Sequence, residues 1–367
     1  MIPDKSLIVR NMYSIRKVTM EITLSLIIFL ALINSASASV GISNFFSDFT
    51  SSDVTINSSQ DFQGKAVFEL LYAGSLVESH EVSLNIKANE AATKVIIWGK
   101  QPQQDYYTAR VSIYDDGKVI ASTSYQVSYG TVSLPSFHVV DFSPTNSGIK
   151  LLLQPFNPSA VDIKIELLDN NDIVYEKTNE DVSLTTNTEI NTAWPFLLTN
   201  NKKYVVRAKI FTHRLYASPL INTYVANFTA TEDVEILPDD VKVDEYGASV
   251  TIRGKSQVPF DGYLVVENRN RMTNQTQTYS RQLEDILVSG TETTAGVVWK
   301  GIAPGTYDVV IRAEDNKNFT ADKYETVFRI PEYPAVTATA TANKIPGFTA
   351  LFLAAMLLLA ARRVKGG

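Results

Sequence analysis

Short runs of alternating apolar and polar residues cover most of the chain and predict β-strands. Residues 107–114 alternate so that one strand face is apolar. The turn at 115–118 contains Asp-Gly and leads into a second alternating run, 119–127, which is the strongest short signal for a hairpin. No stretch between Ser39 and Ile330 keeps a helical period for three turns. The pattern predicts an all-β protein.

Other parts of the chain repeat this arrangement. The run 163–168 meets Asp169-Asn170-Asn171-Asp172 and continues into 173–175, which predicts a second hairpin. Residues 301–311 contain Pro304-Gly305 and then an alternating run, which predicts a turn followed by a strand late in its module.

Four markers recur in the same order about every hundred residues. The tryptophans are 96 and 105 residues apart, a tyrosine opens a strand after each, and an aspartate and a strand-ending glutamate precede each. The markers are Asp48, Glu69, Trp98 and Tyr107, then Asp141, Glu166, Trp194 and Tyr204, then Asp240, Glu267, Trp299 and Tyr307. We interpret them as a weak triplication, with modules at 39–130, 131–232 and 233–331.

About a hundred residues per module, some seven short strands and an aromatic pair near a turn predict three tandem immunoglobulin-like β-sandwiches. The stretch Pro304-Gly305-Thr306-Tyr307 is similar to fibronectin type III and CARDB-like surface modules, in which a tyrosine starts the penultimate strand and packs near the tryptophan. We expect the three tryptophans and tyrosines to form repeat cores. The alternative makes the tryptophans carbohydrate platforms. We expect the three marker glutamates to be solvated strand-end residues rather than ligands.

The N-terminal block has the parts of a secretory signal. Four cations, an apolar run at 22–33 and small residues up to Ala38 match its n-region, h-region and cleavage site. We expect residues 1–38 to be a signal peptide with a helical core, cleaved between Ala38 and Ser39. The alternative is an uncleaved signal anchor.

The C-terminal block is a second apolar segment, predicted to be helical. Residues 348–361 are apolar apart from Thr349. A positively charged cluster follows, which fits a cytoplasmic stop after a membrane segment: Arg362, Arg363 and Lys365. Fourteen helical residues span only about 21 Å, against roughly 30 Å of hydrocarbon. A short span after a polar spacer is typical of a tail that is removed. The Thr/Ala-rich stretch 332–345 predicts an extended stalk.

Pro346-Gly347-Phe348, the apolar segment and Arg362-Arg363 together resemble the PGF-CTERM sorting signal of archaeal surface proteins, over residues 346–367. Thr349 departs from that pattern, in which a second glycine or an acidic residue is frequent. The resemblance implies that an archaeosortase removes the tail and that a lipid anchors the new C-terminus. The alternative is a plain C-terminal membrane anchor. Either way, we expect the protein at the outer face of the cytoplasmic membrane.

Asn-x-Ser/Thr acceptor sequences also suit an exported chain. We expect glycans on two or more of them, with Asn274 the best candidate because residues 268–280 are polar. The candidates are Asn57, Asn227, Asn274 and Asn318.

The amino-acid composition excludes several kinds of functional site. The 367 residues include no cysteine, which excludes disulfides, thiolate metal sites and cysteine nucleophiles. A pI near 5.3 argues against nucleic acid as a partner. The three histidines share no metal-ligand spacing, and the chain has no Gly-x-Ser-x-Gly motif or phosphate-binding glycine loop. We therefore expect no enzyme and no cofactor.

One acidic stretch leaves an alternative open. Asp239, Asp240, Asp244 and Glu245 lie close together in the sequence, at the expected boundary of the second and third modules. Their oxygens could bind Ca²⁺ there, but the spacing fits no EF-hand, and we expect a solvated acidic linker.

The sequence thus predicts an anchored archaeal surface protein with three sandwiches end to end and a structural or adhesive, S-layer-associated role. Its partners would be archaeosortase, the membrane, and S-layer proteins or surface glycans. The rival is a membrane-tethered ligand-binding or accessory protein for an exported enzyme or transporter. A pocket between modules would favour the rival.

Overall fold

The computed structural model describes residues 40–100, 106–128 and 135–332. The predicted signal peptide, the stalk beyond residue 332 and the predicted sorting signal lie outside these residues. The described chain is all β, apart from a single 3₁₀ turn at Pro238–Asp240. Within it, no helix has the length and apolarity needed to cross a membrane.

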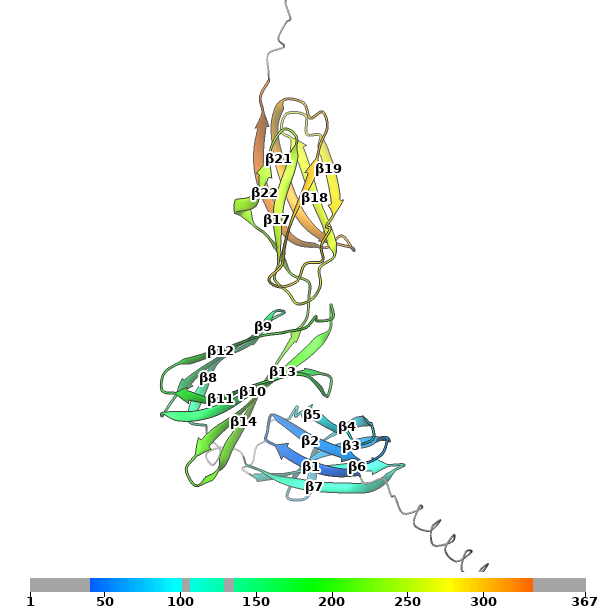
Figure 1. The fold of residues 1–367 in the computed structure, drawn as a ribbon, viewed down its shortest axis with the longest axis vertical. Helices are drawn as coiled ribbons and strands as arrows, with labels where there is room; N and C mark the ends of the chain where they lie inside the picture. Colours follow the sequence, from blue (N-terminus) through cyan, green and yellow to red (C-terminus); the bar gives the residue numbers. More distant parts are fainter. Residues whose placement is uncertain (1–39, 101–105, 129–134, 333–367) are drawn as a thin grey trace, which may run out of the picture.

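The strands form three consecutive modules (Figure 1). The first contains β1 (Val40–Ser47), β2 (Ser51–Ser58), β3 (Phe62–Tyr72), β4 (Ser75–Ile86), β5 (Ala91–Ile97), β6 (Tyr106–Asp115) and β7 (Lys118–Ser128). The second contains β8 (Phe137–Pro144), β9 (Gly148–Pro155), β10 (Ser159–Asp169), β11 (Asp172–Leu184), β12 (Thr188–Ala193), β13 (Lys203–Arg214) and β14 (Ala217–Thr229). The third contains β15 (Val234–Ile236), β16 (Lys242–Val243), β17 (Gly247–Gly254), β18 (Gly262–Asn270), β19 (Thr276–Gln282), β20 (Glu292–Val298), β21 (Gly305–Asp315) and β22 (Thr320–Ile330).

Each module packs one sheet on another. In the first, β1, β2 and β5 face the sheet β4-β3-β6-β7, and in the second β12-β9-β8 faces β11-β10-β13-β14. In the third, β15 and β16 share the place of the first strand beside β17 and β20, opposite β19-β18-β21-β22. Each pair of sheets encloses a separate cluster of buried aliphatic and aromatic side chains. The expectation of an all-β chain of sandwich modules is confirmed.

Both predicted hairpins are confirmed. Asp116 and Gly117 join β6 to β7 with φ of 43° and 79°, and Asn170 joins β10 to β11 with φ of 57°. Left-handed backbone of this kind favours Gly, Asn and Asp, and it matches the twist of paired strands. The residue 301–311 segment also contains the expected late strand, β21.

The marker aromatic residues lie in the three cores. Each tryptophan directly follows a strand, Trp98 after β5, Trp194 after β12 and Trp299 after β20, and their exposed fractions are 6%, 1% and 3%. Buried rings cannot offer a face to a sugar, so the carbohydrate-platform alternative has no support in this structure.

The marker tyrosines lie near the starts of β6, β13 and β21 and are buried as well. In the second module, Phe228 of β14 stacks on both Trp194 and Tyr204. In the third, Phe328 of β22 stacks on both Trp299 and Tyr307 in the same way. Tyr307 also donates its hydroxyl to the carbonyl of Ala303 at 2.8 Å, the bond that makes a tyrosine corner.

The first two modules share one continuous seven-stranded sheet, because β5 of the first pairs with β11 of the second. The amide of Val95 donates to the Asn171 carbonyl at 3.0 Å, and the Asn171 side chain donates back to the Val95 carbonyl at 2.9 Å. Module 1 consequently lies against the side of module 2 (Figure 1), which differs from the end-to-end arrangement expected from sequence.

The second junction is made by the loop between β17 and β18. Val258 of this loop is 1% exposed and belongs to the core cluster of module 2, although its neighbouring strands belong to module 3. Backbone hydrogen bonds tie Gln257 to Leu198 and to Asn146, each at 2.9 Å. The loop therefore closes the end of module 2 with residues of module 3.

Candidate functional site

A glutamate–arginine pair recurs in each module, between β3 and β6, between β10 and β13, and between β18 and β21. Glu69 accepts from Arg110 at 2.8 Å, Glu166 from Arg207 at 2.5 Å, and Glu267 from Arg312 at 3.2 Å. In the first two modules the partners face each other directly across the ladder.

The second pair is buried, because module 1 covers it. Arg207 and Glu166 have side chains only 1% exposed, whereas Arg110 in the equivalent pair is 45% exposed. The expectation that Glu166 is a solvated strand-end residue is wrong. Glu166 lies on the face of β10 that points away from the core of module 2. That face packs against module 1, which buries the side chain.

Four charged side chains make up this junction network, which we define as Asp53, Glu166, Arg207 and Lys209. Arg207 Nη1 lies 2.9 Å and Lys209 Nζ 2.8 Å from Asp53 Oδ2. Burial lowers the pKa of Lys209, and its ammonium also lies 4.0 Å from the centre of the Phe46 ring. Buried charges are tolerated when they are paired and hydrogen-bonded in this way. The network therefore fixes the two modules relative to each other.

A second buried carboxylate, Asp48, joins the same interface. Its oxygens accept from the amides of Thr50, Ser51 and Thr223, and from the Thr223 hydroxyl. Burial raises the pKa of Asp48, and these hydrogen bonds oppose the rise. The Ser51 hydroxyl lies 3.0 Å from that of Thr223 and 3.3 Å from Arg207 Nη1, so Asp48 is linked to the junction network.

Replacing Thr223 with valine keeps the side-chain shape and removes one donor to Asp48. We expect a loss of about 1.5–3 kcal/mol in the free energy of unfolding at pH 7, the usual range for a hydrogen bond to a charged group. A raised carboxyl pKa means that this group favours the folded state below its ordinary pKa of 3.8, and that the contribution is lost as the pH rises through the raised value. The variant raises that pKa further. The difference between the two proteins should therefore be smaller at pH 4 than at pH 7, as measured by urea unfolding at both values. An equal loss at the two pH values would contradict this role of Asp48.

A pocket of about 520 Å³ lies over this interface. Phe46, Asp48 and Tyr125 line it from module 1, and Pro219 and Tyr224 line it from module 2. Apolar rings and a buried carboxylate thus face one space between two modules. This junction pocket is the kind of feature that favours the ligand-binding rival.

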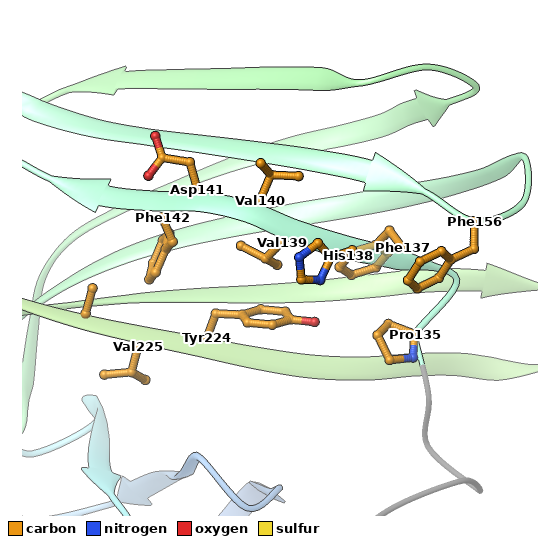
Figure 2. Close-up of a pocket in the computed structure, with 11 residues that line it drawn as sticks. Pro135, Phe137, His138, Val139, Val140, Asp141, Phe142, Phe156, Tyr224 and Val225 are labelled. Carbon is orange, nitrogen blue, oxygen red and sulfur yellow. The ribbon is translucent and has the colours of Figure 1, made fainter.

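A second hollow of about 640 Å³ lies within module 2, between β8 and β14 (Figure 2). These are edge strands of opposite sheets, since each pairs with one neighbour only. Phe137, Val139 and Phe142 of β8 face Tyr224 of β14, and Phe156 at the open end is 66% exposed. Burial raises the pKa of Tyr224 to about 12, so the ring is a neutral phenol at any physiological pH.

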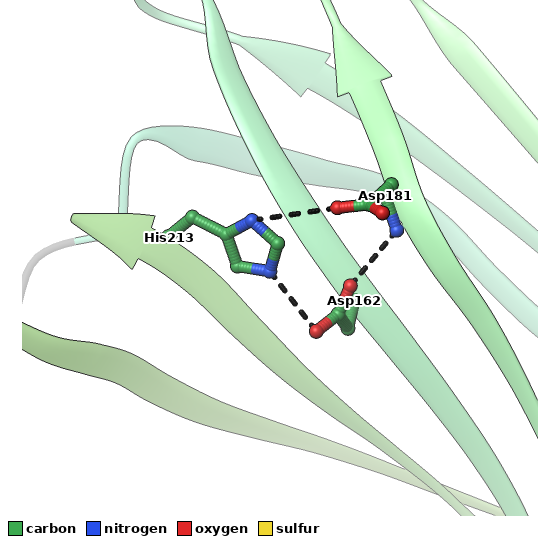
Figure 3. Close-up of side chains that lie close together, drawn as sticks. All are labelled: Asp162, Asp181 and His213. Atoms are coloured by element: carbon green, nitrogen blue, oxygen red, sulfur yellow. Dashed lines mark hydrogen bonds and ion pairs between the residues drawn. The ribbon is translucent and has the colours of Figure 1, made fainter. Parts of the chain in front are cut away.

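Asp162, Asp181 and His213 form a cluster on module 2 (Figure 3), and none of the three lines either hollow. It is the only group of three or more metal-ligating side chains that the described residues bring together. The hydrogen bond to Asp162 raises the pKa of His213, and the same bond lowers the pKa of Asp162. The other histidines lie elsewhere, His80 beside Glu78 in module 1 and His138 at the rim of the β8–β14 hollow.

The four candidate glycosylation sites are all exposed, at Asn57, Asn227, Asn274 and Asn318. Asn274 lies in the turn between β18 and β19, with a φ of 56°. The acidic stretch considered for Ca²⁺ lies inside module 3, between β15 and β17, and not at a module boundary. Asp244 there accepts from the amides of Tyr246 and Gly247, which explains one acidic side chain as a turn cap.

The junction network was missed because the sequence of β13 resembles a strand with one face in solvent. Arg207 and Lys209 alternate with apolar residues in β13, which resembles the solvent face of an ordinary strand. One signal was present: an arginine follows the marker tyrosine by three residues in modules 1 and 2 and by five in module 3. The recurring arginine could have been predicted to pair with the marker glutamate of its module. It gives no indication that the pair in module 2 is buried.

No family model matches the chain, and a search of curated proteins finds no match. Among solved structures, it is similar to a tetra-tandem repeat in the extending region of a large adhesion protein, at 10% identity and a TM-score of 0.25, over 81% of this chain and 75% of that one. It is also similar to E. coli alpha-2-macroglobulin in its native conformation, at 9% identity and a TM-score of 0.22, over 81% of this chain and 22% of that one. A third likeness is to red sea bream transglutaminase, at 8% identity and a TM-score of 0.27, over 55% of this chain and 32% of that one. Scores this low carry no argument about function.

Proposed function

We propose that this chain is an exported archaeal surface protein, held at the outer face of the cell membrane by its C-terminus. Its three modules are immunoglobulin-like sandwiches, and together they form a stiff unit with a structural or adhesive role in the cell envelope. The predicted export signal and the PGF-type tail supply its location, and archaeosortase and the membrane are its first partners.

The observation that carries this proposal is the buried character of both junctions. Tandem modules joined by exposed linkers move independently by default. Here a continuous sheet and the junction network fix module 1 on module 2, and Val258 inserts from module 3 into the core of module 2. A unit that holds its shape without a single disulfide suits a part that positions other envelope components at a set distance from the membrane.

The anchoring half of the proposal is tested by mass spectrometry of the C-terminal peptide from intact envelopes. We expect the native chain to end before the apolar segment, and to carry a lipid. The measured mass should also exceed that of the processed chain, because of glycans on two or more of the four exposed acceptor asparagines. A peptide that continues through Phe348 into Leu351 would contradict removal of the tail and leave the plain membrane anchor.

The rival function, a tethered ligand-binding or accessory protein, is favoured by the junction pocket. It requires that something occupy the space between Phe46, Tyr125 and Tyr224. Native mass spectrometry of protein released from its own membranes separates the two. A bound small-molecule mass that disappears in a Tyr125→Ala variant supports the rival, whereas a bare glycosylated chain supports the structural role.

A further inference from the structure

Asp162, Asp181 and His213 bring three metal-ligating side chains together on module 2 (Figure 3). The three residues come from β10, β11 and β13, and the sheet order β11-β10-β13 makes these strands neighbours. Each offers one ligand atom, and all three atoms lie within 4.8 Å of one another. The sheet, and no flexible loop, therefore sets the positions of the three side chains.

Backbone irregularity turns the two carboxylates toward each other. The β10–β11 ladder shifts register between Val161 and Ile163, and Asp181 lies in the bulged segment with a φ of 51°. Its amide donates to Asp162 Oδ1 at 2.8 Å, which fixes one oxygen and leaves the other facing His213. Bulges re-aim side chains in this way.

The imidazole lies between the carboxylates. His213 Nε2 is 2.9 Å from Asp162 Oδ2, and Nδ1 is 3.8 Å from Asp181 Oδ1. Ligand atoms about a zinc-sized ion with bonds of roughly 2.0–2.2 Å are on the order of 3.4 Å apart. An imidazole binds one ion through one nitrogen only, so the ion would take one ring nitrogen of His213 and one oxygen of each aspartate. One such atom from each side chain lies within 4.8 Å of the other two, and rotation of these partly exposed side chains brings the three atoms to that spacing.

The cluster also lacks a lysine or arginine. In the described part of the chain, the only cationic partner of Asp162 or of Asp181 is His213, whereas each other ion-paired aspartate has a lysine or arginine. Asp162 and Asp181 therefore have no lysine or arginine partner among the described residues. Asp181 is 88% exposed, so an ion has access from solvent.

We propose that Asp162, Asp181 and His213 bind a divalent transition-metal ion of the zinc class at the surface of module 2. One imidazole nitrogen and two carboxylate oxygens suit zinc, which accepts mixed nitrogen and oxygen ligands and completes its shell with water. Calcium is a poor fit, because it prefers six to eight oxygens. The ion links three adjacent strands and leaves open positions, which water or an oxygen donor from a partner molecule fills.

The test is calorimetric titration of the untagged, chelator-treated full chain with ZnCl₂. We expect one saturable site that excess CaCl₂ does not displace. His213→Gln and Asp181→Asn should each weaken it by at least about tenfold, since even indirect metal contacts are worth 10–100-fold. Asparagine tolerates the left-handed backbone of position 181, so Asp181→Asn changes a ligand without straining the turn. Unchanged circular dichroism will show that both variants fold.

The matched control is His80→Gln. His80 also bonds a carboxylate, Glu78, at 2.7 Å, but that carboxylate is already held by the amides of Gly99 and Lys100, and the described residues place no third ligand there. This variant should bind zinc like the parent chain. The proposal is overturned if the parent shows no saturable binding, if calcium displaces zinc at similar concentration, or if His213→Gln binds as well as His80→Gln.

Discussion

Replacing Arg207 with alanine should lower the free energy of unfolding by about 3–5 kcal/mol, the usual result of removing one partner from a buried ion pair. Glu166 would lose its 2.5 Å bond and Asp53 its 2.9 Å bond. The remaining lysines do not replace the lost guanidinium donors. Lys209 already donates to Asp53, and Lys164 lies 3.3 Å from Glu166 but only 2.6 Å from Glu176. Urea unfolding followed by circular dichroism measures the loss.

The chain offers a matched control, Arg110→Ala. Arg110 makes the equivalent pair with Glu69 in module 1, in the same ladder register, but it is 45% exposed. Exposed pairs contribute at most about 1 kcal/mol, so this variant should be nearly as stable as the parent. Equal losses for the two arginines would show that burial by module 1 contributes nothing.

A double variant separates charge from packing. Arg207→Met combined with Glu166→Leu removes one positive and one negative charge and leaves the pair of Lys209 with Asp53. Well-packed apolar replacements of buried ion pairs are often neutral or stabilising. We expect the double variant to regain most of the stability that Arg207→Ala loses. It should also keep modules 1 and 2 unfolding in one transition, whereas Arg207→Ala should split that transition.

Sequence reasoning found what is encoded locally. The Asp116-Gly117 and Asn170-Asn171 turns and the alternating runs on either side specify hairpins by backbone geometry alone, and both hairpins are present. The spacing of tryptophans and tyrosines also identified three similar modules, because each core buries one of each, and modules 2 and 3 repeat the same aromatic contacts.

Contacts between modules could not be predicted from local sequence patterns. Glu166 and Arg207 occupy positions that are outward in their own module, and only the approach of module 1 buries them. Val258 is similar, since a valine in a loop of module 3 gives no sign that it completes the core of module 2. The cluster of Asp162, Asp181 and His213 was missed for a related reason. Its three residues are far apart in sequence and meet only through strand register and a bulge.

The second large effect concerns the core tryptophans. Trp194→Ala should cost about 3–5 kcal/mol, since it removes the largest fully buried side chain of module 2 and leaves a cavity beside Phe228 and Tyr175. Chemical unfolding followed by far-ultraviolet circular dichroism is the suitable measurement, because the substitution also removes a fluorophore. A retained stability would show that Trp194 is not a core residue.

A sharper comparison uses phenylalanine at two equivalent positions. The indole N–H of Trp194 donates to the Thr145 carbonyl at 2.9 Å, whereas that of Trp299 is buried and has no partner among the described residues. Trp194→Phe loses both volume and a hydrogen bond, but Trp299→Phe loses volume and removes an unsatisfied donor. We therefore expect Trp194→Phe to cost about 1–2 kcal/mol more than Trp299→Phe. Because both rings stack on an equivalent phenylalanine of the last strand, the difference isolates the indole hydrogen bond. If Trp299→Phe were the more costly change, its N–H would have to bind a group, such as a buried water, that the protein atoms do not supply.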